Sequence, residues 1–154
     1  MKSLIIYESF YGHTHVVAKA IGETLALHGE VTIMRADEAQ INDLRDIDLL
    51  VVGCPTQWLG VTAATRAFFD QIPADGLRGI RVALFDTRYQ RTNWLIGSTA
   101  ERLERTVYKL GGGIIAPPEN FVVADREGPL VEGEVERARS WATALVASKV
   151  IDPA

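Results

Sequence analysis

The sequence lacks the features that stabilise or anchor many proteins by means other than a packed core. Cys54 is its one cysteine, which excludes an internal disulfide and a cysteine-based zinc site and fits a reducing compartment. The longest uncharged stretch, 49–65, contains Gly53, Pro55 and Gly60 and is therefore a poor membrane span. We expect no segment to cross a bilayer.

An excess of positive charge is also absent. The 154 residues carry 16 Lys and Arg against 20 Asp and Glu, so the net charge is -4 and the usual electrostatic basis for nucleic-acid binding is missing. Residues 1–77 hold five basic and ten acidic side chains, whereas residues 78–154 hold eleven and ten. The local basic excess lies in four arginines of the second half: Arg78, Arg81, Arg88 and Arg91.

What is present is the composition of a globular protein. Apolar residues make up 47% and charged residues 23% of the chain, and the length fits a single domain over 1–154. Met1-Lys2-Ser3 leads directly into an apolar strand pattern with no cleavage-type segment. We therefore expect a cytoplasmic protein with one core.

Apolar runs and helical periodicity alternate along the chain. The strand patterns cover 2–7, 31–34, 48–54, 81–85 and 114–123, the last broken by Pro117-Pro118. Helix patterns cover 12–28, 38–44, 62–71, 132–149 and a segment that opens at the capping box Ser98-Thr99-Ala100-Glu101 and ends at Gly111. In the first helix, Val16, Val17 and Ile21 are expected on the core face. This alternation predicts a three-layer α/β/α sandwich with a five-stranded parallel sheet.

Two strand orders suit five such units: half of a dinucleotide-binding sheet, or the order 2-1-3-4-5. The pattern alone does not separate them. In either order, ligands bind at the carboxyl ends of the strands near the point where the order reverses. The segments to inspect are therefore the expected loops 8–14, 54–61 and 86–97.

The first loop has the properties of an anion site. It places Ser9, Gly12 and Thr14 between a strand and a helix N-terminus, where backbone N–H groups and hydroxyls converge. The alternative is that Ser9 and Thr14 merely cap the helix. No Lys follows the glycine as a Walker loop requires, and Gly-x-Gly-x-x-Gly is missing, which disfavours NTP hydrolysis and NAD binding at this crossover.

The segment 5–21, IIYESFYGHTHVVAKAI, resembles the signature of the flavodoxin family. The resemblance implies the strand order 2-1-3-4-5 and FMN as the cofactor. It also implies that the hydroxyls of Ser9 and Thr14 bind the FMN phosphate, together with backbone N–H groups of the intervening residues. The implied phosphate-loop residues are Ser9, Phe10, Tyr11, Gly12, His13 and Thr14. The histidines are not expected to bind a metal.

The second loop, 53–60, is also flavodoxin-like, because Gly-x-Pro-Thr followed by an aromatic residue lines the flavin ring in that family. Trp58 offers a large flat apolar face, and Gly60 lets a neighbouring peptide turn over. The alternative is a Trp58 that packs in the core, and Cys54 is expected as a small buried filler. The implied flavin-site residues are Pro55, Thr56, Gln57, Trp58, Leu59 and Gly60.

The third loop, 86–97, stands where flavodoxins add a second aromatic side chain. The implied site residues are Asp86, Thr87, Arg88, Tyr89 and Trp94, with Tyr89 or Trp94 as the stacking group. Its basic character departs from the acidic electron carriers, and residues 80–141 resemble flavodoxin-family proteins of actinobacteria. Arg88 and Arg91 therefore either raise the flavin potential or form a solvated docking patch for an acidic partner.

Three functions remain open at this point. The first is an FMN-binding electron carrier that serves redox partner proteins, which the lack of a long insertion favours. The second is an NAD(P)H:quinone-type oxidoreductase with a small quinone-like acceptor. A flavodoxin-type protoporphyrinogen dehydrogenase fits less well for lack of an inserted loop. The third is a non-redox binding module, although a receiver domain is disfavoured because Gly53-Cys54 stands where its phosphoacceptor Asp would be. The oligomeric state is open.

Overall fold

Six strands and four helices alternate in the computed structural model, which describes residues 1–56, 60–90, 98–125 and 127–151. The strands are β1 (Lys2–Tyr7), β2 (Glu30–Arg35), β3 (Leu49–Pro55), β4 (Arg81–Tyr89), β5 (Gly113–Ile114) and β6 (Glu119–Val123). The helices are α1 (His13–Leu25), α2 (Ala63–Asp70), α3 (Thr99–Lys109) and α4 (Glu134–Ala147), with short 3-10 turns η1 (Ala26–His28) and η2 (Ile41–Leu44).

The strands form one parallel sheet in the order β2-β1-β3-β4-β5, which confirms the predicted order 2-1-3-4-5. The order reverses between β1 and β3, because the chain leaves β1 toward one edge and returns to add β3 on the other side. Both strands are buried almost throughout, as expected for strands covered on two faces. The reversal point lies at the centre of the sheet.

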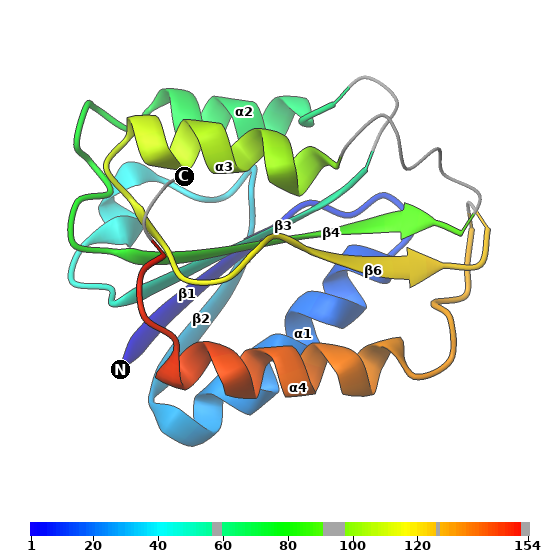
Figure 1. Cartoon of the computed structure of the whole chain (residues 1–154). Coiled ribbons are helices and arrows are strands. Elements are labelled where there is room, and N and C mark those ends of the chain that lie inside the picture. Colours follow the sequence, from blue (N-terminus) through cyan, green and yellow to red (C-terminus); the bar gives the residue numbers. More distant parts are fainter. Residues whose placement is uncertain (57–59, 91–97, 126, 152–154) are drawn as a thin grey trace.

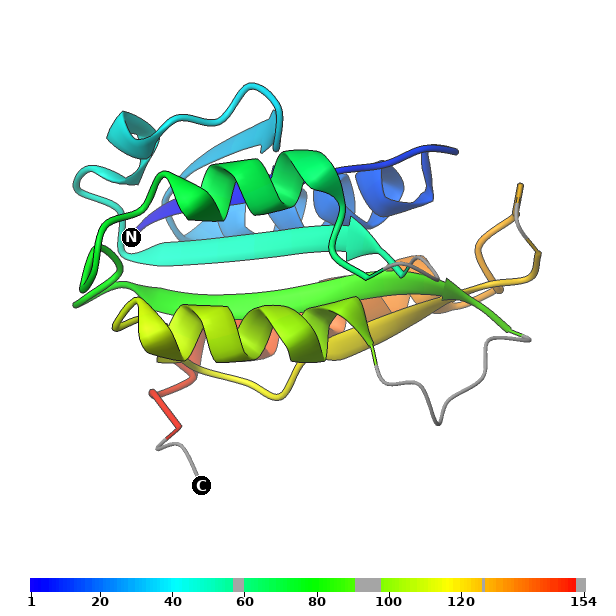
Figure 2. The same ribbon diagram turned by 90° about the horizontal axis from the view of Figure 1, so that it is seen from above.

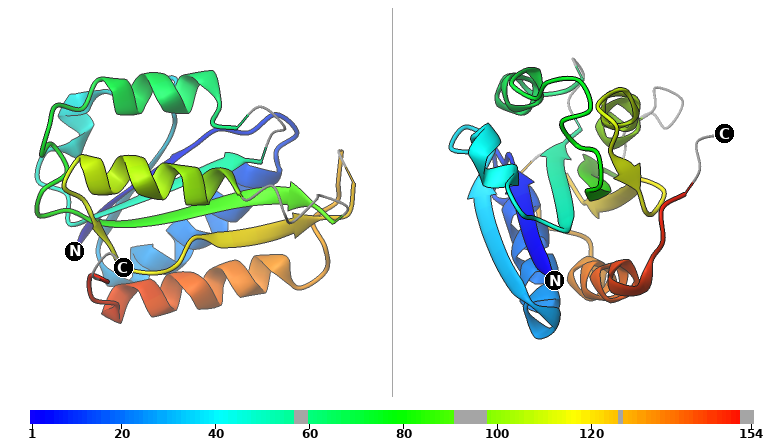
Figure 3. Two further views of the ribbon diagram at one scale, coloured as in Figure 1. Left: turned by 45° about the horizontal axis from the view of Figure 1, so that its top comes forward. Right: turned by 90° about the vertical axis from the view of Figure 1, so that its left-hand side faces the viewer.

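The helices cover both faces and complete three layers (Figure 1; Figure 3, right). α2 and α3 lie over β3 and β4 on one face, as the view from above shows (Figure 2), and pack on a core that contains Leu84 and Phe68. α1 and α4 cover the other face over a core that contains Val51, Ile21 and Phe85. The α/β/α sandwich is confirmed.

The expected fifth strand is two strands. Pro117-Pro118 interrupts it, and the two parts, β5 and β6, both pair in parallel with β4. β4 is long enough to take both, because β5 pairs with its first residues and β6 pairs with Phe85 to Tyr89. Proline lacks the N–H that a ladder needs, so the break falls at the prolines.

Three helix predictions need correction. Residues 38–44 were expected to form a helix, but only η2 forms there, without the length that a packed helix needs. The first helix ends at Leu25 and continues as η1 instead of running to His28. Val16 was placed on the core face but is 44% exposed, whereas Val17 and Ile21 are buried as expected.

The start of α4 is held by an ionic network. Glu134 accepts hydrogen bonds from the Val122 N–H at 2.7 Å and from Arg137 Nε at 2.9 Å, and Arg137 also pairs with Glu119 at 2.6 Å. The hydrogen bonds from Arg137 hold the pKa of Glu134 below its ordinary value, although burial opposes this. The Glu134 side chain is only 11% exposed.

Replacing Glu134 by Ala is therefore expected to lower the free energy of unfolding by about 2 kcal/mol near neutral pH, the value of a charged hydrogen bond. Because the folded-state pKa is the lower one, the loss is full above about pH 4.5 and disappears as the pH falls through the folded pKa. Denaturant unfolding across this range measures it. Glu136→Ala is the matched control in the same helical turn: its side chain is 73% exposed, so a loss equal to that of Glu134→Ala would contradict the account.

Candidate functional site

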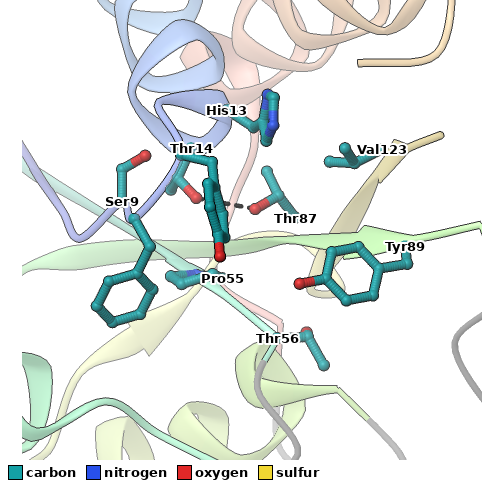
Figure 4. Close-up of a pocket in the computed structure, with 10 residues that line it drawn as sticks. Ser9, His13, Thr14, Pro55, Thr56, Thr87, Tyr89 and Val123 are labelled. Atoms are coloured by element: carbon teal, nitrogen blue, oxygen red, sulfur yellow. Dashed lines mark hydrogen bonds between the residues drawn. The ribbon is translucent and has the colours of Figure 1, made fainter. Parts of the chain in front are cut away.

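A pocket lies at the edge of the sheet where β1, β3, β4 and β6 end (Figure 4). The empty space between its walls, which includes the part open to solvent, is about 340 Å³. The lining residues are Ser9, Phe10, Tyr11, His13, Thr14, Pro55, Thr56, Thr87, Tyr89 and Val123. The structure thus brings together nine of the residues that the sequence singled out, from three separate segments.

The N-terminus of α1 faces this pocket without a cap. Gly12, the N-cap residue, has a φ of 87°, a left-handed conformation that glycine adopts without strain. No side chain caps the helix, and its first turn contains no acidic residue. The first N–H groups of a helix and its dipole attract an anion, so this end of α1 is suited to receive one.

The other helix N-termini in the described part of the chain have carboxylates nearby. α2, like α1, has no side-chain cap and no acid in its first turn, but the hydroxyl of its N-cap residue, Thr62, donates to Glu8. At α3, Ser98 and Glu101 form the predicted capping box. Glu134 lies in the first turn of α4. The contrast leaves α1 as the end where an external anion fits best.

Two polar atoms around the pocket reinforce this conclusion. Ser9 Oγ and His13 Nε2 are buried and have no hydrogen-bond partner among the residues that the structure describes. Leaving a buried polar group unpaired costs about 1–3 kcal/mol, so such groups usually mark a missing partner. A ligand with several hydrogen-bonding oxygen atoms would satisfy them.

The floor of the pocket is a pair of hydroxyls. Thr14 Oγ1 of α1 and Thr87 Oγ1 of β4 lie 2.8 Å apart and are both buried (Figure 4). The Thr14 side chain, expected to point at the ligand, therefore also ties α1 to the central strand. Thr56 is held nearby, because its N–H donates to the Thr87 carbonyl at 2.8 Å.

The expected third loop begins later than predicted. Asp86, Thr87, Arg88 and Tyr89 belong to β4 and not to a loop, because β6 pairs with them on one side. Asp86 is fully buried and Arg88 is 3% exposed, and their side chains form an ion pair of 3.5 Å. Neither residue lines the pocket.

This placement settles one alternative for Arg88. A side chain 3% exposed and paired with Asp86 does not belong to a solvated docking patch, so that interpretation is wrong for Arg88. Arg91 lies outside the described residues. Burial raises the pKa of Asp86 above its ordinary value, although Arg88, the hydroxyls of Thr56 and Ser98, and the Ala100 N–H oppose the shift.

Two described residues of the second loop do not line the pocket. Gly60 has a φ of 92°, and a Cβ there would lie 2.4 Å from Arg102 Nη1, so this position favours glycine because of its backbone conformation and the nearby Arg102 side chain. Cys54 is fully buried, as expected for a filler, and burial raises the pKa of its thiol well above the ordinary value. Four further predicted residues lie outside the described residues: Gln57, Trp58, Leu59 and Trp94.

Two residues of the site were missed. Val123, the last residue of β6, lines the pocket, and Gly128 packs against His13, where a Cβ would lie 2.3 Å from the imidazole Cε1. Ala124 and Pro129 lie side by side, since the Ala124 N–H donates to the Pro129 carbonyl at 2.9 Å. The Asp-x-x-Gly spacing of Asp125 and Gly128 is a turn signal in the sequence.

The fold and the site define an α/β protein with a pocket suited to an anionic ligand, at the reversal point where sheets of this kind hold nucleotides. Within the described residues, no helix is both long and apolar enough to pass through a membrane. A sequence model of the family "Flavodoxin" matches residues 5–141. The chain belongs to the flavodoxin family.

Individual proteins are also similar to this chain in sequence or in structure. An NAD(P)H dehydrogenase (quinone) of Caulobacter vibrioides is 34% identical over an alignment 90 residues long, which covers 45% of this chain and 45% of the relative. A flavodoxin of Synechocystis is 28% identical over 82 residues, 53% of this chain and 48% of the relative. The matches thus span about half the length of these proteins. The crystal structure of oxidised Flavodoxin 2 from Bacillus cereus superposes with a TM-score of 0.79 at 22% identity, covering 95% of this chain and 98% of the other.

Proposed function

We propose that the protein binds FMN and carries electrons between redox partners. The observation that carries the proposal is the uncapped N-terminus of α1 beside the orphaned Ser9 Oγ, an arrangement that fits a terminal phosphate. Membership of the flavodoxin family supports FMN as the phosphorylated ligand. FMN, when bound, supplies a ring that accepts and releases one or two electrons.

Different residues of this chain would hold the phosphate and the ring of the ligand. Ser9, His13 and the first N–H groups of α1 would hold the phosphate, and Thr14 with Thr87 would fix the distance between the helix and the sheet. Pro55, Thr56 and Tyr89 line the part of the pocket nearer the ends of β3 and β4 and would contact the ring. FAD should bind less well than FMN, because an adenylate would have to leave the closed phosphate loop.

An NAD(P)H:quinone-type oxidoreductase is the second candidate. The observation in its favour is the 34% identity to an NAD(P)H dehydrogenase (quinone). The two candidates differ in donor: a reductase takes hydride from NADH or NADPH, whereas a carrier takes single electrons from a reduced protein or a one-electron dye. The acceptor would be a quinone-like molecule for the reductase and a partner protein for the carrier.

Anaerobic stopped-flow reduction of the FMN-loaded protein separates the candidates. A carrier is reduced by a one-electron donor and not measurably by NADH or NADPH, and it passes electrons to a protein acceptor such as cytochrome c. Rapid bleaching of the flavin by NADH or NADPH, followed by turnover with a benzoquinone, would establish the reductase instead. A colourless protein that takes up no FMN would leave a non-redox binding module.

Aromatic stacking on the flavin is the next prediction. Tyr89, which lines the pocket, or Trp94 is expected on one side of the ring and Trp58 on the other. Tyr89→Ala and Trp58→Ala should each weaken FMN and riboflavin equally, by about 1–3 kcal/mol, since stacking involves the ring and not the phosphate. They should also brighten flavin emission. Unchanged emission in a folded Trp58→Ala variant would assign that residue to packing.

A further inference from the structure

Ionisable side chains form a row across the sheet on the face covered by α2 and α3. Glu8 follows β1, and Cys54 of β3 is the register partner of Asp86 of β4. Arg88 lies two residues further along β4, and side chains two apart share a face of a strand. Thr87, between them, points to the opposite face, where it meets Thr14. The row therefore lies directly behind one wall of the pocket.

Asp86 is the buried centre of this row. Its Oδ2 lies 3.5 Å from Arg88 Nη2 and 3.4 Å from the Ala100 N–H at the start of α3. The hydroxyl of Thr56, whose residue lines the pocket, lies close enough to Asp86 to stabilise its ionised form. One side chain thus separates a fully buried carboxylate from the space where the ligand would bind.

The charges of this pair are coupled to any charge that the pocket acquires. Arg88 carries a positive charge, so the pair is neutral when Asp86 is ionised. If the ligand gains negative charge, that charge repels the ionised Asp86 carboxylate. The repulsion is strong because the protein interior has a low dielectric constant. A proton on Asp86 removes that repulsion and leaves Arg88 to balance the ligand. Burial already raises the pKa of Asp86, so its neutral form is accessible.

We propose that Asp86 takes up a proton from solvent when an electron arrives on the flavin bound in the pocket, and releases it when the electron leaves. The electron comes from the one-electron donor and the proton from hydronium or a buffer acid of the solvent, whose bond to hydrogen breaks as the O–H bond of the carboxylic acid forms. The positive charge of Arg88 then balances the negative charge of the reduced flavin, and no longer that of Asp86. This inference rests on the proposed binding of FMN and adds a proton to the electron that the protein carries.

The neighbours of Asp86 do not provide an equally buried alternative. Cys54 on β3 is neutral, because burial raises the pKa of its thiol. Glu8 at the end of β1 is half-buried and accepts from Thr62 of α2. Glu101 of α3 is exposed and bonds the Ser98 N–H, and Glu119 of β6 pairs with Arg137. Asp86 alone among these five groups is a fully buried carboxylate.

The test follows the Asp86 carboxyl in the FMN-loaded protein by ¹³C NMR of labelled aspartate, between about pH 5 and 8, first oxidised and then reduced with dithionite. The Asp86 resonance is assigned from its loss in Asp86→Asn. The expected result is a titration whose midpoint rises on reduction. Proton uptake on reduction, followed with an indicator dye in weak buffer, should exceed that of Asp86→Asn by up to one proton per FMN. An Asp86 that keeps one ionisation state in both redox states would overturn the proposal.

Two further variants keep the test decisive. Asp86→Asn leaves Arg88 without this partner in the interior, so Asp86→Asn combined with Arg88→Gln provides a neutral pair if the single variant does not fold. Glu134→Gln is the control, since Glu134 also lies at a helix N-terminus with an arginine; its proton uptake should equal that of the wild type. Proton uptake that the neutral pair leaves intact would overturn the proposal. Failure to bind FMN would overturn the proposed function itself, whereas FMN binding without the proton difference overturns the linkage alone.

Discussion

Ser9→Asp is expected to lower the affinity for FMN at least 100-fold while leaving the apo-protein as stable as the wild type or more stable. The new carboxylate would stand beside the N-terminus of α1, which has no side-chain cap and no acid in its first turn. A negative charge there stabilises a helix by about 0.3–1 kcal/mol. The same charge would repel a phosphate: two unit charges about 5 Å apart at an effective dielectric of about 20 interact by roughly 3 kcal/mol, which is more than 100-fold in affinity.

The opposite signs of the two effects make this prediction specific. Calorimetric titration with FMN and with riboflavin, together with denaturant unfolding of the apo-protein, measures both effects. Riboflavin has no phosphate, so its affinity should change little. Ser9→Asn adds nearly the same volume without charge and should cost FMN less than a tenth of the loss seen with Asp. Equal losses for FMN and riboflavin in Ser9→Asp would show that the phosphate is bound elsewhere.

Gly53→Ala is expected to destabilise the protein by about 2–4 kcal/mol, although it adds a single methyl group. Gly53 lies in β3 opposite Phe85, and a Cβ there would stand 2.0–2.5 Å from three atoms of the Phe85 ring. That ring is fully buried and meets Phe121 and Trp141 edge to face at about 6 Å, so it cannot move aside without disturbing both. Denaturant unfolding of the apo-protein gives the loss.

A double-mutant cycle shows whether the Phe85 ring is the cause. Phe85→Leu removes the ring atoms that the new methyl group would meet, so Gly53→Ala should cost clearly less in that background than in the wild type. Additive losses would place the strain of Gly53→Ala elsewhere. Because Pro55 and Thr56 lie within three residues of Gly53 and line the pocket, FMN affinity should fall with stability.

The sequence is most informative where function and local structure depend on the same short segment. In 8–14, strand end, turn and helix start are consecutive, and five residues of that segment line the pocket as expected: Ser9, Phe10, Tyr11, His13 and Thr14. The capping box at Ser98 and Glu101 forms as predicted for the same reason, since all its contacts are within four residues. Whether these pocket residues bind FMN stays a prediction.

Long-range pairing explains what the sequence pattern missed. Asp86 and Arg88 have the composition of a loop, but β6 extends β4 through them, and their opposite charges make burial tolerable. A short stretch of sequence around residue 86 shows neither that β6 pairs with this part of β4 nor that the two charges form an ion pair. Val123, at the end of β6, and Gly128, in the turn that follows, also reach the site from more than 100 residues after Ser9.

Equilibrium titration of the apo-protein with FMN and with riboflavin, under identical conditions, tests the central claim most directly. A terminal phosphate held by the N-terminus of α1 and by Ser9 predicts one FMN per chain and an affinity for FMN at least 100-fold higher than for riboflavin. Equal affinities for the two ligands, or no binding of FMN at all, would contradict it.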